Sequence, residues 1–147
     1  MALLPALRVG ASGLTAQRLR MNVISTNLAN VNTTRTAEGG PYRRQDPVFA
    51  ALPAASTFED SLRAAILPSP LKEVRVVGIA EDTRGPRMVY DPQHPDANPQ
   101  GYVAMPNIDT VTEMIDLLSA ARAYEANVTA INATKSMAMK ALEIGRS

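Results

Sequence analysis

The distribution of proline along the chain limits where long helices can form. Ten of the eleven prolines lie between Pro41 and Pro106. A proline inside a helix removes a backbone hydrogen bond and clashes with the preceding turn. Long helices are therefore confined to about the first forty and the last forty of the 147 residues. The middle must consist of strands, turns and irregular segments.

The first segment carries an apolar pattern with a period of seven residues. Pro5 suits the first turn of a helix. The helix should end near the asparagine-rich run at residues 27–34, because asparagine tolerates the left-handed conformation that closes helices. The pattern predicts an amphipathic helix with a narrow packing seam, which consists of Leu7, Leu14, Met21, Ile24, Leu28 and Val31.

The last segment carries a longer helix signal. Asp109 can act as the N-cap, and Glu113 and Asp116 place negative charge in the first turns, where the helix dipole favours it. Between Asp109 and Gly145 there is no proline or glycine, so we expect one helix of roughly 37 residues, about 55 Å long. Alternating spacings of three and four residues predict a coiled-coil seam broken only by Lys135, which consists of Met114, Leu117, Ala121, Tyr124, Val128, Ile131, Lys135, Ala138 and Leu142.

The middle segment has a short β-rich pattern. A run at residues 74–79 and a second at 88–90 flank a turn at 82–86, which predicts a β-hairpin. The fold class we expect is therefore mostly α-helical with a small β-containing middle. The two terminal helices pair as a coiled coil, and a β-hairpin and irregular insert lies between them. We expect a discontinuous helical domain at residues 1–34 and 107–147, and an outer domain at residues 35–106.

The composition lacks the groups that most enzyme sites need. The chain has no cysteine, and its one histidine, His94, lies between prolines in a polar loop. There is no glycine-rich phosphate loop, and the net charge of +1 gives no reason to expect a nucleic-acid partner. We therefore predict no enzyme activity, no catalytic, cofactor-binding or metal-binding residue, no cofactor, no nucleic-acid partner and no small-molecule substrate.

Two N-terminal segments carry a specific signature. Residues 11–17 and 22–33 resemble the N-terminal signature of bacterial flagellar rod and hook proteins. The family-motif residues are Asn27, Leu28, Ala29, Asn30, Asn32 and Thr33. Further segments look like the short, proximal-rod members of that family, and they lie at residues 39–44, 89–92, 94–96, 101–103, 106–107 and 119–127.

The resemblance implies a structural subunit of the proximal rod of the flagellar basal body. Such subunits polymerise into a hollow axial drive shaft that transmits torque and surrounds the export channel. The implied partners are copies of the chain, other rod proteins, the flagellar type III export apparatus and, as candidates at the rod base, the membrane-ring protein and a basal adaptor. The implied location is the rod that spans the periplasm, reached by export without a cleaved signal peptide.

The residue pattern by itself leaves two other functions open. A helical-hairpin adaptor would show the same paired helices, and a small nucleic-acid-binding module could use the basic residues near Tyr42. A rod subunit should become regular only in the polymer, whereas an adaptor should be folded alone. A nucleic-acid binder should be retained on DNA in a salt-dependent manner.

Overall fold

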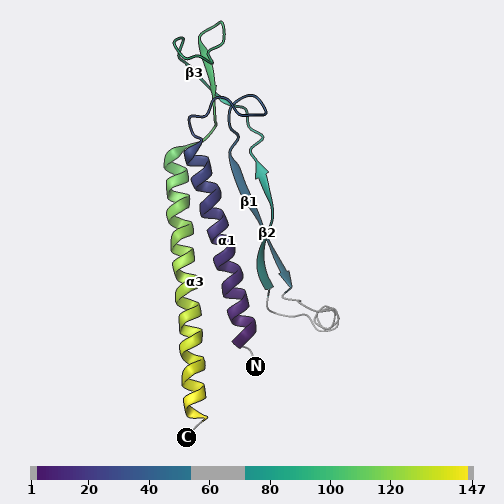
Figure 1. The fold of residues 1–147 in the computed structure, drawn as a ribbon, viewed down its shortest axis with the longest axis vertical. Coiled ribbons are helices and arrows are strands. Elements are labelled where there is room, and N and C mark those ends of the chain that lie inside the picture. Colours follow the sequence, from purple (N-terminus) through teal and green to yellow (C-terminus); the bar gives the residue numbers. More distant parts are fainter. Residues whose placement is uncertain (1–2, 54–71, 146–147) are drawn as a thin grey trace.

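The computed structural model describes residues 3–53 and 72–145. Two long helices and four strands follow one another in the order α1 (Leu3–Ala29), β1 (Gln45–Pro53), β2 (Lys72–Glu81), β3 (Arg87–Tyr90), β4 (Tyr102–Met105) and α3 (Thr110–Ile144). Figure 1 shows the two helices side by side, with β1 and β2 along α1 and β3 beyond the helix ends. The predicted fold class is confirmed. The division into two domains stays a prediction.

The helices α1 and α3 run antiparallel. Arg20 on α1 forms an ion pair with Asp116 on α3 at 3.2 Å, and Gly10 on α1 lies against Ile131 farther along α3. The helices contain 27 and 35 residues. Counting on from Ile131, the α3 residues after about 138 lie past Leu3, so the C-terminal end of α3 extends beyond α1 (Figure 1). We call residues 138–144 the overhang.

The face of α3 that packs against α1 contains only some of the predicted seam residues, and polar or small residues occupy the positions between them. Glu113 and Ala120 are buried, and the half-buried side chains include Leu117, Tyr124, Asn127 and Ile131. Gly13 leaves space for Asn127, whose Nδ2 would lie 3.1 Å from a Cβ at that glycine. Polar and small residues therefore alternate with the predicted apolar ones.

The other residues of the predicted seams lie in three environments. Ile24 is buried. Met114 and Leu142 are 53% and 66% exposed, and neither packs inside the chain as a seam residue would. The half-buried residues are Leu7, Leu14, Met21, Leu28, Val31, Ala121, Val128 and Ala138, and Lys135 is exposed. Met114 turns outward because Glu113, one position earlier, takes the inward place.

The strand pairing corrects the expected hairpin. The strands near residues 74–79 and 88–90 both exist, but they do not pair with each other. Strand β2 pairs with β1, from Gln45↔Glu81 to Pro53↔Lys72, and β3 pairs with β4. A strand of ten residues finds more ladder partners in nine-residue β1 than in four-residue β3. Strand β1 was missed because its two prolines argue against a strand.

The helices begin and end near the predicted residues, but α1 does not end in the expected left-handed conformation. The N-cap is Asp109, as predicted, and its Oδ1 accepts a hydrogen bond from the Val111 amide at 3.1 Å. Helix α1 ends at Ala29 without a left-handed asparagine, because in the described ranges only glycines have positive φ. Asn30 instead donates from Nδ2 to the Thr26 carbonyl at 2.9 Å. The α3 C-cap, Gly145, is right-handed at φ −75°.

A substitution at Gly10 should separate the helices. A Cβ at this position would lie 2.8 Å from Ile131 Cγ1. We expect Gly10→Leu to lower the free energy of unfolding by about 1–3 kcal/mol through overpacking, despite the higher helix propensity of leucine. The measurement is urea unfolding followed by circular dichroism, at a chain concentration at which the wild-type helices are formed. The double variant Gly10→Leu/Ile131→Ala should recover most of the loss, and an unchanged single variant would contradict this packing.

Candidate functional site

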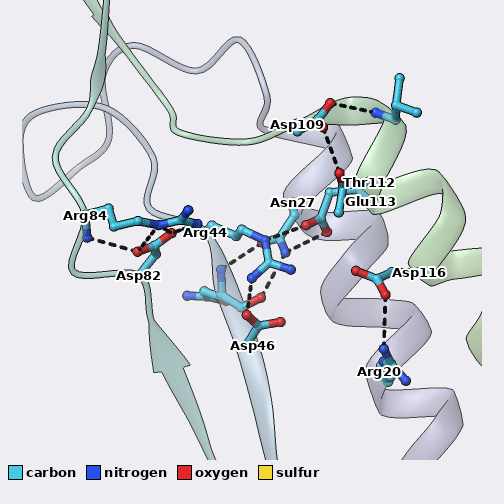
Figure 2. Close-up of polar contacts among 12 residues, drawn as sticks. Arg20, Asn27, Arg44, Asp46, Asp82, Arg84, Asp109, Thr112, Glu113 and Asp116 are labelled. Carbon is cyan, nitrogen blue, oxygen red and sulfur yellow. Dashed lines mark hydrogen bonds and ion pairs between the residues drawn. The ribbon is translucent and has the colours of Figure 1, made fainter.

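A buried polar cluster joins three elements at one end of the helix pair. It lies where α1 ends, β1 begins and α3 begins (Figure 2). We call it the junction, and it consists of the side chains of Asn27, Tyr42, Arg44 and Glu113 with the backbone of Gln45. Asn27 is fully buried and Glu113 is 1% exposed. Burial of such polar groups is costly unless their hydrogen bonds are satisfied.

Asn27 uses all the hydrogen-bonding capacity of its side-chain amide. Its Nδ2 donates to the Gln45 carbonyl at 2.9 Å and to Glu113 Oε2 at 3.1 Å. Its Oδ1 accepts from the Gln45 amide at 3.0 Å and from the Tyr42 hydroxyl at 3.0 Å. An amide has two donors and two acceptor positions, so none is left unpaired. Because it bonds both the amide and the carbonyl of Gln45, the Asn27 side chain fixes the start of β1 to α1 in the way that the backbone of a neighbouring strand would.

The Glu113 carboxylate receives both its partners from other elements. Arg44 Nε donates to Glu113 Oε1, while Arg44 also forms an ion pair with Asp46. Burial would lower the pKa of Arg44, but its hydrogen bonds to Glu113 and Asp46 outweigh that and raise it. The pKa of Tyr42 is raised by burial and by the negative charge of Glu113. Both groups therefore keep their protons and act as donors.

The segment after α1 is held by local bonds that involve the rest of the family motif. Thr33 Oγ1 donates to Asn30 Oδ1 at 3.1 Å, and the Thr33 carbonyl accepts from the Tyr42 amide at 3.0 Å. Leu28 is half-buried, and Ala29 and Asn32 are exposed. The motif thus contains one residue that holds separate elements together, Asn27, and others that shape the turn.

Further polar contacts connect α1 to β2. Arg8 pairs with the buried Glu73 at 2.9 Å, and the Val74 amide donates to Ser12 Oγ at 3.1 Å. These contacts hold β2 along the length of α1, away from the junction. The β1–β2 ribbon is therefore fixed to the helix pair at more than one place.

The exposed loop between β2 and β3 contains a separate ion pair. Arg84 donates to both carboxylate oxygens of Asp82, at 3.0 and 2.8 Å from Nε. These bonds lower the pKa of Asp82 from 3.8 to about 2. The pair shapes the turn that leads from one ribbon to the other (Figure 2).

Sequence reasoning missed most of the junction. From the sequence, the basic residues near Tyr42 were assigned at most a nucleic-acid contact, and Glu113 an interaction with the helix dipole. The structure turns Tyr42 and Arg44 inward and leaves only Arg43 exposed. The sequence signal for this arrangement was the alternation expected directly before a strand, in which every second residue of 42–44 faces inward. His94 lies in its loop, where its Nδ1 accepts from the Asp96 amide at 3.1 Å.

Two classes of site are absent from the described ranges. Residues 3–53 and 72–145 contain no group of three or more acidic, histidine or cysteine side chains placed to hold a metal ion. No helix in these ranges combines the length and the apolar character that a membrane crossing requires.

Replacement of Asn27 by aspartate tests the junction with almost no change of shape. The variant Asn27→Asp places a second carboxylate next to Glu113 and removes the donor to the Gln45 carbonyl. We expect the free energy of unfolding to fall by about 3–5 kcal/mol at neutral pH, the usual cost of an uncompensated buried charge. The deficit should shrink as the pH falls and the new carboxyl gains a proton.

The matched control is Asn30→Asp, which makes the same chemical change at a side chain with an exposed hydrogen bond. It should cost less than about 1 kcal/mol. Urea unfolding at several pH values measures both variants, at a chain concentration at which the wild-type helices are formed. Equal losses for the two variants would show that the junction has no special role.

Removal of Arg84 tests the ion pair in the loop. In Arg84→Ala, the pKa of Asp82 should rise from about 2 toward 3.8, because its hydrogen-bond donor is lost. The lowered pKa contributes stability above pH 3.8, and that contribution is lost as the pH falls toward 2. Carboxyl NMR of Asp82 between pH 1.5 and about 6 measures the shift. An unchanged pKa would exclude Arg84 as its cause.

Comparison with known proteins gives a consistent family assignment. The family model described as "Flagella basal body rod protein" matches residues 7–35, and that described as "Flagellar basal body rod FlgEFG protein C-terminal" matches residues 100–144. These ranges contain most of α1 and α3, with Asn27 in the first and Glu113 in the second.

Curated relatives match almost the whole chain. The flagellar basal-body rod protein FlgC of Bacillus subtilis is 49% identical over 96% of this chain and 97% of its own. The FlgC of Borreliella burgdorferi is 46% identical over 98% of both chains. The FlgC of Salmonella typhimurium is 37% identical over 99% of this chain and 100% of its own. The chain therefore belongs to the FlgC family of flagellar basal-body rod proteins.

Proposed function

We propose that this chain is a structural subunit of the flagellar basal-body rod, where it assembles with copies of itself and with other rod proteins. The observation that carries the proposal is the uncovered apolar surface of α3, in a chain that matches rod proteins over nearly its full length. Soluble monomers rarely expose contiguous apolar patches of this kind unless another molecule binds there. The apolar surface supports a role in assembly.

The finer parts of the proposal concern position in the rod. The chain belongs to the proximal rod, a hollow shaft that spans the periplasm, transmits torque and surrounds the export channel. Residues 1–34 and 107–147, the ranges that contain α1 and α3, form the inner part, and residues 35–106 form the outer part. The polar middle of α3, with Arg122, Glu125 and Lys135 exposed, suits a face toward a water-filled channel.

Torque transmission requires the subunit to resist bending between its parts. The junction supports this role, because one set of buried bonds joins both helices to β1. The contacts of Arg8 and Ser12 with β2 add a second attachment along α1. Export precedes assembly and uses the flagellar type III apparatus without cleavage of a signal peptide.

We assign the predicted seam residues to two kinds of contact, one within the chain and one between subunits. Those that are buried or half-buried pack between α1 and α3. Met114 and Leu142 lie on exposed surface, and they contact neighbouring subunits. The adaptor alternative predicts a monomer that is stable and soluble with these faces uncovered, so the state of the isolated chain discriminates between the two functions.

A charge in the seam should prevent rod formation. Leu117 is half-buried on the inward line of α3. In Leu117→Asp, an unpaired carboxylate in this position should cost several kcal/mol, repeated in every copy. Rods should fail to form and swimming should be lost, as measured by electron microscopy of basal bodies and by motility in the source bacterium.

Two controls accompany this variant. Ser136→Asp introduces the same charge at an exposed position of the same helix, and His94→Ala changes a loop residue distant from the seam. Both should form rods and swim. Normal rods with Leu117→Asp would show that rod formation does not depend on the seam. Absence of rods with His94→Ala would show that its loop is required for assembly.

A further inference from the structure

The β1–β2 ribbon twists as it runs along α1, so that each strand in turn lies next to the helix. At the junction, the Gln45 backbone of β1 bonds to the Asn27 side chain through both its amide and its carbonyl. Farther along α1, the Val74 amide of β2 donates to Ser12 Oγ at 3.1 Å. Figure 1 shows the two strands crossing between these places. The edge of the ribbon that faces α1 therefore belongs to β1 near the junction and to β2 at the other end.

The pairing register shows which backbone amides point out of the ribbon. In an antiparallel pair, directly opposed residues alternate between those that bond to each other and those whose backbone groups point outward. Ala51 is opposite Val74, and the Val74 amide points outward to Ser12. The amide of Ala51, an exposed residue, therefore points outward on the other side of the ribbon, away from α1. We call this outward side of β1, from Phe49 to Pro53, the free edge.

Both prolines of β1 occupy outward positions. The Gln45 amide points outward, and steps of two residues from it reach Pro47, Phe49, Ala51 and Pro53. A proline has no amide hydrogen, and at these positions its presence leaves the hydrogen bonds between β1 and β2 intact. The free edge consequently has two donors, at Phe49 and Ala51. It ends at Pro53, the last residue of β1.

The segment between the prolines would otherwise favour pairing between identical strands. Residues 48–52 are all apolar and uncharged, and Val48 and Leu52 are 44% and 38% exposed. Segments that pair with copies of themselves typically have roughly six or seven such residues without proline. Pro47 and Pro53 limit the run in β1 to the five residues 48–52.

Two other features of β2 reduce pairing at this edge. The register passes over Val77, which makes a bulge in β2, and a bulge increases the twist of a ribbon. Lys72, which is exposed, lies opposite Pro53. Natural sheets use prolines, bulges and lysines at exposed edges to prevent the addition of another strand. All three occur together in this ribbon.

We propose that Pro53 closes the free edge against the addition of a β-strand from a second copy of this chain. Each copy presents the same apolar segment beside the same two outward donors, so identical edges are the partners that must be prevented from pairing. Pro53 removes the third donor of the row and ends the apolar run. It acts wherever β1 and β2 are paired, whether or not the chain is a rod subunit.

Aggregation of the full-length chain tests the proposal, at a concentration at which the native helices are formed. In Pro53→Val, a third outward amide lengthens the row of donors, and thioflavin T fluorescence should rise several-fold faster than with the native chain. Pro53→Ala adds the same donor without a branched side chain and should also aggregate faster. Ala51→Val is the matched control, because it adds a branched side chain to the same edge but no donor. It should aggregate at the native rate.

The double variant Ala51→Pro/Pro53→Val removes one outward donor as it adds another, and it should return to the native rate. A second pair of variants tests which amides point outward. Ala51→Pro should leave amide hydrogen exchange in β2 unchanged. Ala50→Pro should accelerate this exchange several-fold, because the amide of Ala50 bonds to its partner Arg75 within the ribbon.

Three results would overturn the role of Pro53. The first is native aggregation rates for both Pro53→Val and Pro53→Ala. The second is aggregation of Ala51→Val as fast as that of Pro53→Val, which would make the apolar side chain the cause. The third is an equal acceleration of exchange in Ala51→Pro and Ala50→Pro, which would show that the Ala51 amide does not point outward.

Discussion

The four hydrogen bonds of the Asn27 side chain determine how the helices and the first strand meet. One amide group binds the backbone of Gln45 through both its nitrogen and its oxygen, and it also binds Glu113 on α3. An apolar residue of similar size would leave the Glu113 carboxylate and the Gln45 backbone short of partners. The loss of a single buried partner is therefore more costly than one ordinary hydrogen bond.

Polar residues also fix how α1 and α3 align along their length. Asn127 lies opposite Gly13, and Glu113 occupies an inward position that an apolar residue would fill in a uniform seam. A seam of leucines alone allows several alignments that differ by one heptad, because each buries similar surface. Buried polar groups permit only the alignment in which they are paired, at some cost in stability. The Arg20–Asp116 ion pair favours the same alignment.

The sequence was sufficient for the parts of the fold that depend on local pattern. Proline placement and heptad spacing predicted both helices, and Asp109 was recognised as a cap. Strand pairing was not predictable in this way, because β1 carries two prolines and its partner β2 is remote in sequence. The junction was also hidden, since Asn27 sits in an asparagine-rich run that suggests a helix end. The three residues that bind the Asn27 side chain lie up to 86 positions away in the sequence, and no local pattern indicates contacts over that separation.

The pairing of the first helix with the last has a kinetic consequence. Arg20 and Asp116 are 96 positions apart in the chain, and most contacts of α1 that bury apolar surface are of this kind. Contacts between remote segments require closure of a long loop before they return any stabilisation, which slows folding. While the chain emerges from its N-terminus, α1 can contact β1 and β2, but its partner helix α3 is absent until nearly all the residues have followed. The first segment to appear is thus among the last to complete its packing.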